Sequence, residues 1–469
     1  MPSSAPLRGR SPTRTNSGGP KPIGARAIAL RGLLAGDDVV RELDAQIRSV
    51  RPSPADSALA TRIAYGTLKM RRALEWSLMP FLRKPLNSLS EPLRWTLLMG
   101  AYQLLYLRVP AHSAVDESVR LARAQGHAGT AALANAVLRK LSVDGRTPPD
   151  PQSDRSIEAL ALFASLPDWI AQHLVDRFGW ATARQIAAGI NGAPRRALRL
   201  SLDRLTRAAA LEALRRANFD ARPSAYGIEE CVLIEAAPAR SRLIEDWLAS
   251  GAAAWQSEHS QLAVHLLAPK PGERIFDVCA GRGVKTAQIA ARVGPDGCVY
   301  ALDDDEPRIS QLRRTMARRD FDNVLGITAD ARAPYPRPMP ERADAVLLDA
   351  PCSALGLLGR RADVRWRKHP TDPARFAAVQ RRLLARAAEY VRPGGRLLYV
   401  TCSTHPAEDE NVIGDFLNGT AQWKPWASDG VASGASLLEL GSYLLSVPGV
   451  GGGDGFFYAG VQRLADEAR

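Results

Sequence analysis

The fold is decided by residues 274–286, which read Arg-Ile-Phe-Asp-Val-Cys-Ala-Gly-Arg-Gly-Val-Lys-Thr. A short apolar run that ends in a turn predicts a buried strand over Arg274–Cys279. Gly281 and Gly283 allow the backbone of the turn to approach a ligand closely, and a helix is expected over Lys285–Val293. This strand, glycine turn and helix are typical of an α/β domain that binds a ligand at a helix N-terminus.

The same alternation of strand and helix continues toward the C-terminus. Further strands are expected at Val299–Asp303, Ala345–Asp349 and Leu397–Thr401, with helices around Ile309 and Leu383 between them. Strands and helices that alternate with short connections predict a parallel, doubly wound α/β sheet over residues 251–465. Ligands of such sheets bind at the carboxyl ends of the strands, so we expect the functional residues there.

Two other domains and a tail are predicted upstream. Residues 1–23 are rich in Ser, Pro, Gly and Arg and predict a disordered basic tail. Helical spacing, as in Leu93–Leu107, predicts an all-α domain over residues 24–145, in which Ser113 is expected to cap a helix.

A linker at Thr147–Asp154 is expected to lead into a small α+β domain over residues 155–250. Within it, Leu198, Leu200 and Leu202 alternate with polar residues, which predicts a half-buried strand. We expect Thr206 to cap the helix that follows.

Composition narrows the function classes. The 469 residues include 62 Lys and Arg against 49 Asp and Glu, a net charge of +13, which favours nucleic acid as a partner over an anionic membrane surface. No run of 18 apolar residues predicts a membrane-spanning helix. Five cysteines without a C-x-x-C pair exclude a disulfide framework and the usual zinc spacings, so we expect no metal and a reducing, cytoplasmic location.

Acids at two strand ends indicate the kind of cofactor. Asp303 lies 20 residues after Gly283, where a carboxylate can accept hydrogen bonds from ribose hydroxyls. Asp330, after the next strand, could accept one from an adenine amino group. Together with the glycine turn, these acids predict a cofactor that contains a nucleoside.

The cysteines differ in context. Cys231 and Cys298 lie in apolar runs and are expected in the core, and Cys279 is expected to pack beside the cofactor loop. Cys352 and Cys402 each follow an apolar strand at the ligand edge and precede a serine, which favours nucleophilic catalysis with an attacking and an assisting thiol. Two buried turns without chemistry remain the alternative. Nearby arginines could lower a thiol pKa: Arg360, Arg361, Arg365 and Arg367.

Three segments together resemble the RNA cytosine-5 methyltransferases of the NOL1/NOP2/Sun family. Asp277–Thr286 stands at the family's cofactor loop, Asp349–Ser353 at its D-A-P-C-S motif and Thr401–Ser403 at its T-C-S motif. Gly100–His112 and Asn135–Arg139 resemble a NusB-like RNA-binding module. The resemblance covers roughly residues 24–465 and implies that residues 251–465 form an S-adenosylmethionine-dependent methyltransferase domain.

The resemblance also implies roles. Cys402 would attack carbon 6 of a cytosine, Cys352 would assist release of the adduct, and Asp349 would touch the base edge. The substrate would be RNA, in particular 16S rRNA, and we expect a monomer. The residues implied to bind S-adenosylmethionine are Cys279, Ala280, Gly281, Arg282, Gly283, Val284, Lys285, Asp303, Asp330 and Asp349.

Two other functions remain open at this point. In a DNA cytosine methyltransferase the cysteine after the proline, here Cys352, would be the nucleophile, and tRNA is a further possible substrate. The family's loop usually reads A-P-G-G-K, whereas this chain has Arg282 and Val284 in place of Pro and Gly. A non-enzymatic RNA-binding assembly factor with a degenerate cofactor pocket is therefore the second alternative.

Overall fold

The computed structural model describes residues 24–36, 39–237, 241–426 and 436–465, so the predicted tail lies outside the described residues. The chain divides into two compact units. One contains the described residues up to Thr67 together with Leu78–Gly145, and the other contains Leu68–Ser77 and the residues from Arg146 onward.

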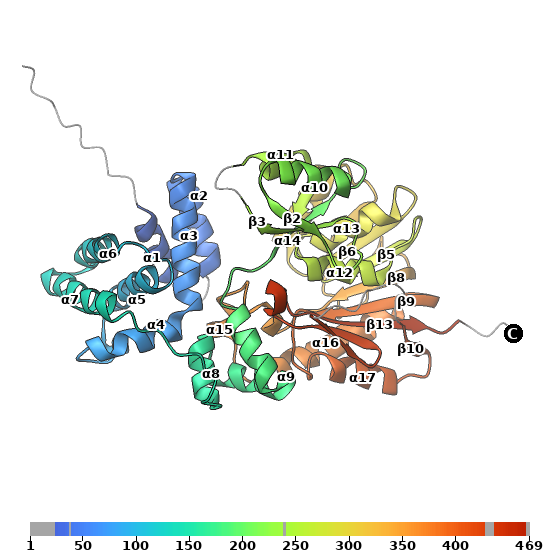
Figure 1. Ribbon diagram of the computed structural model, residues 1–469. Helices are drawn as coiled ribbons and strands as arrows, with labels where there is room; N and C mark the ends of the chain where they lie inside the picture. Colours follow the sequence, from blue (N-terminus) through green and yellow to red (C-terminus); the bar gives the residue numbers. More distant parts are fainter. Residues whose placement is uncertain (1–23, 37–38, 238–240, 427–435, 466–469) are drawn as a thin grey trace, which may run out of the picture. The chain divides into compact units, whose positions relative to one another are not determined.

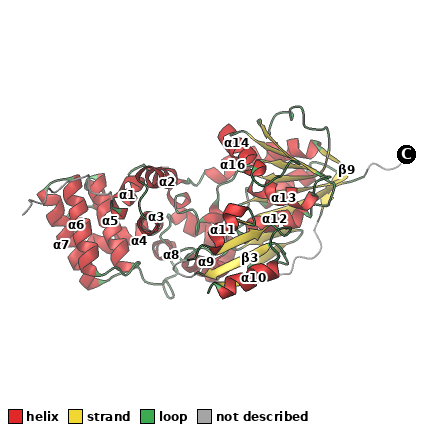
Figure 2. Ribbon diagram, turned by 90° about the horizontal axis from the view of Figure 1, so that it is seen from above, coloured by secondary structure: helices red, strands yellow, loops and turns green. Residues whose placement is uncertain are grey.

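Helices make up all the regular secondary structure described in the first unit (Figure 2). Its helix α5 (Glu91–Leu105) buries Leu93, Leu97 and Leu98, as the apolar spacing predicts. The α-helices are α1 Ala25–Leu33, α2 Val39–Val50, α3 Pro54–Lys69, α5 Glu91–Leu105, α6 Ala111–Gln125 and α7 Ala128–Asp144. Two short 3₁₀ turns, η2 Met79–Phe81 and η3 Leu86–Ser88, precede α5, and α4 Arg71–Leu78 lies mostly in the second unit.

The predicted cap at Ser113 is wrong. Helix α6 begins at Ala111, with Pro110 at its N-cap, so Ser113 lies inside the first turn. Proline fits the entry to a helix because the first N–H groups need no intrahelical partner there.

After α4, the second unit continues with two helices, α8 Ile157–Ala164 and α9 Asp168–Gly189, and a small antiparallel sheet follows them. Its strand order is β2-β3-β1-β4, the ferredoxin-like arrangement of a β-α-β-β-α-β motif. Thr206 Oγ1 accepts a hydrogen bond from the Ala209 N–H (3.3 Å), so the predicted cap is confirmed. The elements are β1 Arg196–Leu200, α10 Arg207–Arg216, β2 Asp220–Pro223, β3 Cys231–Ala236, α11 Leu243–Ser250 and β4 Ala253–Trp255.

A nine-stranded sheet forms the rest of the second unit (Figure 1). The main path runs β11-β12-β13-β9-β8-β5-β6-β7, in which the strands from β9 to β7 are parallel; β10 pairs with β13. The strands are β5 Arg274–Val278, β6 Cys298–Asp303, β7 Val324–Thr328, β8 Ala343–Asp349, β9 Val391–Thr401, β10 Trp423–Pro425, β11 Leu437–Leu440, β12 Tyr443–Ser446 and β13 Phe457–Arg463.

Helices cover both faces of this sheet. Helices α12 Glu258–Leu267, α13 Val284–Val293 and α14 Glu306–Ala317 pack on one face. Helices α16 Asp372–Glu389 and α17 Glu410–Asn418 pack on the other. The connections include η4 Leu355–Leu357, α15 Val364–Arg367 and η5 Val450–Gly452. The predicted multidomain fold, with an all-α part and a doubly wound α/β part, is confirmed; the exact domain boundaries stay a prediction.

The prediction of a half-buried strand near Leu200 is wrong in two respects. Strand β1 ends at Leu200, which leaves Leu202 outside it. Both faces of β1 are buried, because α10 and α11 cover one and α12 and α13 cover the other. Arg199 therefore lies in the interior with only 5% of its surface exposed.

None of the helices in the described ranges combines the length and the apolar character needed to cross a lipid bilayer.

Candidate active site

The two singled-out thiols lie together at the carboxyl edge of the large sheet. Strands β8 and β9 are parallel neighbours, with Asp349 opposite Val400, so the loops that follow them meet. The Sγ atoms of Cys352 and Cys402 are 3.0 Å apart, and both cysteines are free and partly exposed. This places two reduced sulfur atoms within reach of one substrate atom.

A buried carboxylate ties these two loops together. Glu408 is fully buried and accepts hydrogen bonds from the Ser353 N–H (2.8 Å) and from the Ser353 hydroxyl. It also accepts from the Ser403 hydroxyl (2.9 Å) and from Gln380 Nε2 (3.2 Å). Because Ser353 follows Cys352 and Ser403 follows Cys402, Glu408 fixes the position of both thiols. Burial raises the pKa of Glu408, although these hydrogen bonds work in the opposite direction.

The surroundings of Cys352 disfavour its thiolate form. The hydrogen bond with Cys402 is the main cause that raises the pKa of Cys352 well above its usual value, followed by burial and by the charges of Cys402 and Glu408. A thiol with a raised pKa stays protonated and can donate a proton. The Cys352 thiol lies 3.0 Å from the Cys402 sulfur, so a proton can pass between the two groups.

The arginines that were expected to lower a thiol pKa are engaged elsewhere. Arg361 and Arg367 pair with Asp363, and Arg360 pairs with Asp454. The fourth, Arg365, is fully buried and donates to the carbonyl oxygens of Leu358, Ala164 and Ile190, among others. For Cys352 the expectation is wrong: these guanidinium groups are engaged by other residues, and the pKa of the Cys352 thiol is raised.

The loop between β5 and α13 has the backbone that its glycines predict. Gly281 and Gly283 have positive φ values of 57° and 81°. A side chain at Gly283 would place its Cβ 2.6 Å from Leu312 Cγ, whereas Gly281 faces open space. The Gly281 N–H donates to Asp303 Oδ2 (2.8 Å), so the acid at the end of β6 holds the loop in place.

A cleft of about 710 Å³ lies beside this loop. Within it, Lys285 Nζ donates to Asp349 Oδ2 at 2.6 Å. Burial works to lower the pKa of Lys285, but Asp349, Asp277 and Cys402 outweigh it and raise this pKa. The predicted cofactor residues that line the cleft are Cys279, Ala280, Gly281, Arg282, Val284, Lys285 and Asp349.

The remaining predicted residues do not line the cleft. Gly283 and Asp303 support the loop from behind, through Leu312 and Gly281. Asp330 is exposed and forms an ion pair with Arg332 (2.8 Å), and Cys352 and Cys402 lie on the adjacent strand ends.

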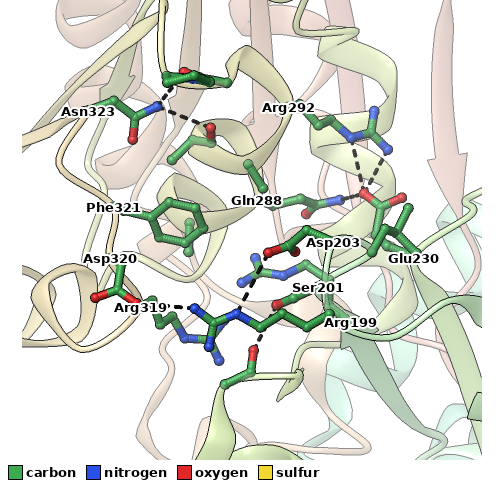
Figure 3. Close-up of a pocket in the computed structure, with 18 of the residues that line it drawn as sticks. Arg199, Ser201, Asp203, Glu230, Gln288, Arg292, Arg319, Asp320, Phe321 and Asn323 are labelled. Carbon is green, nitrogen blue, oxygen red and sulfur yellow. Dashed lines mark hydrogen bonds and ion pairs between the residues drawn. The ribbon is translucent and has the colours of Figure 1, made fainter.

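A different pocket, of about 570 Å³, lies along the C-terminal half of α13 (Figure 3). Figure 3 shows Arg292 paired with Glu230 (2.7 Å) on one side and the ring of Phe321 on the other. Its lining includes Gly297 and Asn323, which immediately precede β6 and β7, so it lies at the amino edge of the sheet. None of the predicted site residues lines it, and the cleft beside the glycine loop is therefore the candidate site.

Comparisons with known proteins agree with this geometry. The sequence model described as 16S rRNA methyltransferase RsmB/F matches residues 264–462, and that of the NusB family matches residues 24–142. Ribosomal RNA small subunit methyltransferase B of Vibrio cholerae is 32% identical over 431 residues, which cover 91% of this chain and 94% of that protein. This chain belongs to the RsmB/F family of 16S rRNA methyltransferases.

Other relatives and solved structures support the family and the fold. The small subunit methyltransferase B of Serratia proteamaculans is 31% identical over 419 residues, 88% of this chain and 92% of that protein. The crystal structure of PH0851 has a TM-score of 0.76 at 24% identity and covers 94% of this chain and 99% of that one. A methyltransferase homolog from Pyrococcus horikoshii has a TM-score of 0.54 at 23% identity, over 66% of this chain and 100% of that one. At these sequence identities, the two structures support the fold and do not indicate the function.

The chain is accordingly an S-adenosylmethionine-dependent methyltransferase, and its cleft fits that cofactor. A volume of about 710 Å³ is within the range of about 300–1,000 Å³ that small ligands occupy. The open space at Gly281 lets a ligand approach the backbone, and Lys285 and Asp349 supply charged groups. Asp277 Oδ1, at the end of β5 just before the loop, is buried and has no hydrogen-bond partner in the described part of the chain.

Sequence reasoning missed Glu408 and its hydrogen bonds to the serines that follow the two cysteines. Glu408 stands in the acidic run Glu408-Asp-Glu410 just before α17, which is typical of an exposed helix N-terminus. Its donors come from Ser353, 55 residues away in the chain, so only the packing of the two loops reveals its role. The serines after both cysteines were the one available signal.

Proposed function

We propose that this chain transfers a methyl group from S-adenosylmethionine to carbon 5 of a cytosine in 16S rRNA, through a covalent adduct with Cys402. The observation that carries the proposal is the pair of free thiols with sulfur atoms 3.0 Å apart at the ends of β8 and β9. Attack on the base needs only one thiol, in its thiolate form. A second thiol, which is protonated, can assist when the covalent adduct is later released.

The thiols account for the two difficult steps. Carbon 5 of cytosine is a poor nucleophile, and addition of the Cys402 thiolate to carbon 6 forms an S–C bond and moves electron density onto carbon 5. The cofactor supplies an electrophilic methyl group. Transfer of the carbon 5 proton to solvent then lets the electrons of that C–H bond re-form the C5–C6 double bond, so the S–C bond breaks and its electron pair returns to the Cys402 sulfur. The Cys352 thiol, 3.0 Å from that sulfur, is placed to donate a proton to the released thiolate.

Charged groups in the cleft would hold the base. Asp349 lies at the end of β8, three residues before Cys352, and its ion pair with Lys285 fixes the carboxylate (2.6 Å). A carboxylate in this place can accept a hydrogen bond from the amino group at the edge of a cytosine. This arrangement supports the choice of cytosine as the target base.

Several observations support 16S rRNA as the substrate. The relatives in Vibrio cholerae and Serratia proteamaculans are named for the small ribosomal subunit RNA, and the NusB match covers residues 24–142. The net charge of +13 suits a polyanion such as RNA.

The two free cysteines bear on the location of the protein. A cytoplasmic location, where thiols stay reduced, fits them.

Bisulfite mapping of 16S rRNA tests the proposal. We expect one cytosine to be protected in rRNA from cells that carry the gene and to become convertible when the gene is deleted. The purified protein with S-adenosylmethionine should restore protection at the same nucleotide in vitro. An unchanged map in the deletion strain would contradict the proposal, and protection of a tRNA or DNA cytosine instead would reassign the substrate.

A further inference from the structure

The candidate cleft contains an exposed aromatic side chain that the reaction does not use. Trp255, the last residue of β4, has 37% of its surface exposed and lines the cleft together with Lys285 and Asp349. Val284, 44% exposed, lines the same cleft. Large apolar side chains that stay exposed inside a cleft mark a surface that a ligand covers.

An arginine lies over the ring of this tryptophan. The Arg196 guanidinium carbon is 4.2 Å from the centroid of the Trp255 ring, a close cation–π contact. Its sequence neighbour Arg195 pairs with Glu235 and Glu258, whereas the described part of the chain contains no acid in an ion pair with Arg196. The positive charge of Arg196 is thus available to an anionic ligand at the cleft.

The pair is held on a rigid base. Trp255 is in register with Leu198 of β1, and the next residue, Gln256, is buried. Gln256 accepts a hydrogen bond from Arg199 (2.9 Å) and donates one to Gln288 (2.8 Å). A side chain on such a base loses little conformational freedom when a ligand stacks on it.

The position of the pair distinguishes the possible ligands. Trp255 shares the cleft with the glycine loop, but Asp303 and Asp330, the acids expected to take the nucleoside of the cofactor, do not line it. Asp349, which does line it, ends the strand that leads to Cys352. An aromatic ring next to an arginine is the combination that binds an unstacked nucleobase and its phosphate.

We propose that Arg196 and Trp255 form a stacking subsite for an RNA nucleotide that flanks the target cytosine, with the base on the indole and the phosphate near the guanidinium. The inference rests on the proposed function, because it requires an RNA strand in the cleft. It adds a contact that would help to hold the target base out of its stack.

Methyl-transfer kinetics test the subsite with 16S rRNA as substrate. Loss of one base–aromatic stack, about 1–3 kcal/mol, corresponds to a weakening of about 5- to 140-fold. Trp255→Ala should therefore raise the KM for RNA by a factor in that range, while Trp255→Phe retains most of the affinity. Arg196→Ala should raise the same KM. Leu438→Ala, at an exposed apolar residue on β11 outside the cleft, serves as the matched control and should leave the KM unchanged.

Two further measurements keep the outcomes distinct. Calorimetry with S-adenosylmethionine should give the same Kd, within twofold, for wild type and Trp255→Ala; a Kd that rises as much as the KM would assign Trp255 to the cofactor and overturn the proposal. Titration with a single-stranded oligoribonucleotide should quench wild-type fluorescence more than that of Trp255→Phe, a binding readout that requires no methyl transfer. Equal quenching would refute the subsite even if methylation is intact, whereas unequal quenching without methylation would refute the proposed function alone.

Discussion

Replacement of Glu408 by alanine should loosen both cysteine loops at once. The variant leaves the buried Ser353 N–H without its acceptor at 2.8 Å, which costs about 1–3 kcal/mol. It also removes charge-assisted hydrogen bonds from two hydroxyls and from Gln380, each of about 1.5–3 kcal/mol. Part of this is recovered, because the hydroxyls of Ser353 and Ser403 already face each other at 3.2 Å and Gln380 keeps its bond to the Pro351 carbonyl (2.9 Å).

We therefore expect Glu408→Ala to lower the free energy of unfolding by about 3–5 kcal/mol, measured by urea denaturation. A misplacement of reacting atoms by about 1 Å can cost about 10²-fold in rate, so kcat for methyl transfer should fall by about that factor. Glu408→Gln, which keeps the shape and one acceptor oxygen, should lose less in both measurements.

Asp415→Ala is the matched control for this prediction. Asp415 lies on α17 close to Glu408 in the chain, but it forms an exposed ion pair with Arg381 (2.7 Å). Such a pair contributes less than about 1 kcal/mol. If Glu408→Ala destabilised the protein no more than Asp415→Ala and left kcat intact, the role of Glu408 in holding the two cysteine loops would be refuted.

Three other variants probe the core, the loop and the fold. Burial raises the pKa of Asp277 from 3.8 to about 7, so protonation of Asp277 stabilises the folded state at low pH. This contribution to the free energy of unfolding, about 4 kcal/mol at most, is lost as the pH rises from about 4 through 7. Urea titrations at pH 5 and pH 8 should show that Asp277→Asn removes this share of the pH dependence; an unchanged dependence would count against it. Arg365→Met leaves several buried carbonyl oxygens without donors and should lower the free energy of unfolding, measured with guanidinium, by about 3–5 kcal/mol. A decrease below about 1 kcal/mol would contradict the structural role assigned to Arg365. Asp303→Ala removes the acceptor that holds the Gly281 N–H and should raise the Kd for S-adenosylmethionine about 10- to 100-fold in calorimetry. If the wild-type protein showed no detectable binding, the result would favour a non-enzymatic assembly factor.

The sequence predicts the strand ends well because their chemistry is local. Asp349, Cys352 and Cys402 each follow an apolar run, and the parallel order of β8 and β9 then brings the loops to one edge. The glycine loop is equally visible, since Gly281 and Gly283 adopt backbone angles that other residues avoid.

Features that depend on packing between distant segments could not be predicted. Arg365 reads as a charge free to act on a thiol, but α8, α9 and their flanking residues bury it completely. Arg199 belongs to a pattern of alternation that indicates solvent on one face, yet α12 and α13 cover that face. The antiparallel strands β11–β13 at the end of the large sheet also escape a prediction based on alternating strands and helices.

The central claim is that Cys402 attacks the base and Cys352 assists its release. Each cysteine variant is incubated with 16S rRNA and S-adenosylmethionine, and the products are separated by denaturing electrophoresis. We predict that Cys352→Ser accumulates a protein–RNA complex that survives denaturation, whereas Cys402→Ser and the double variant with Cys402→Ala form none. A stable complex with Cys402→Ser, and none with Cys352→Ser, would contradict the account and make Cys352 the nucleophile.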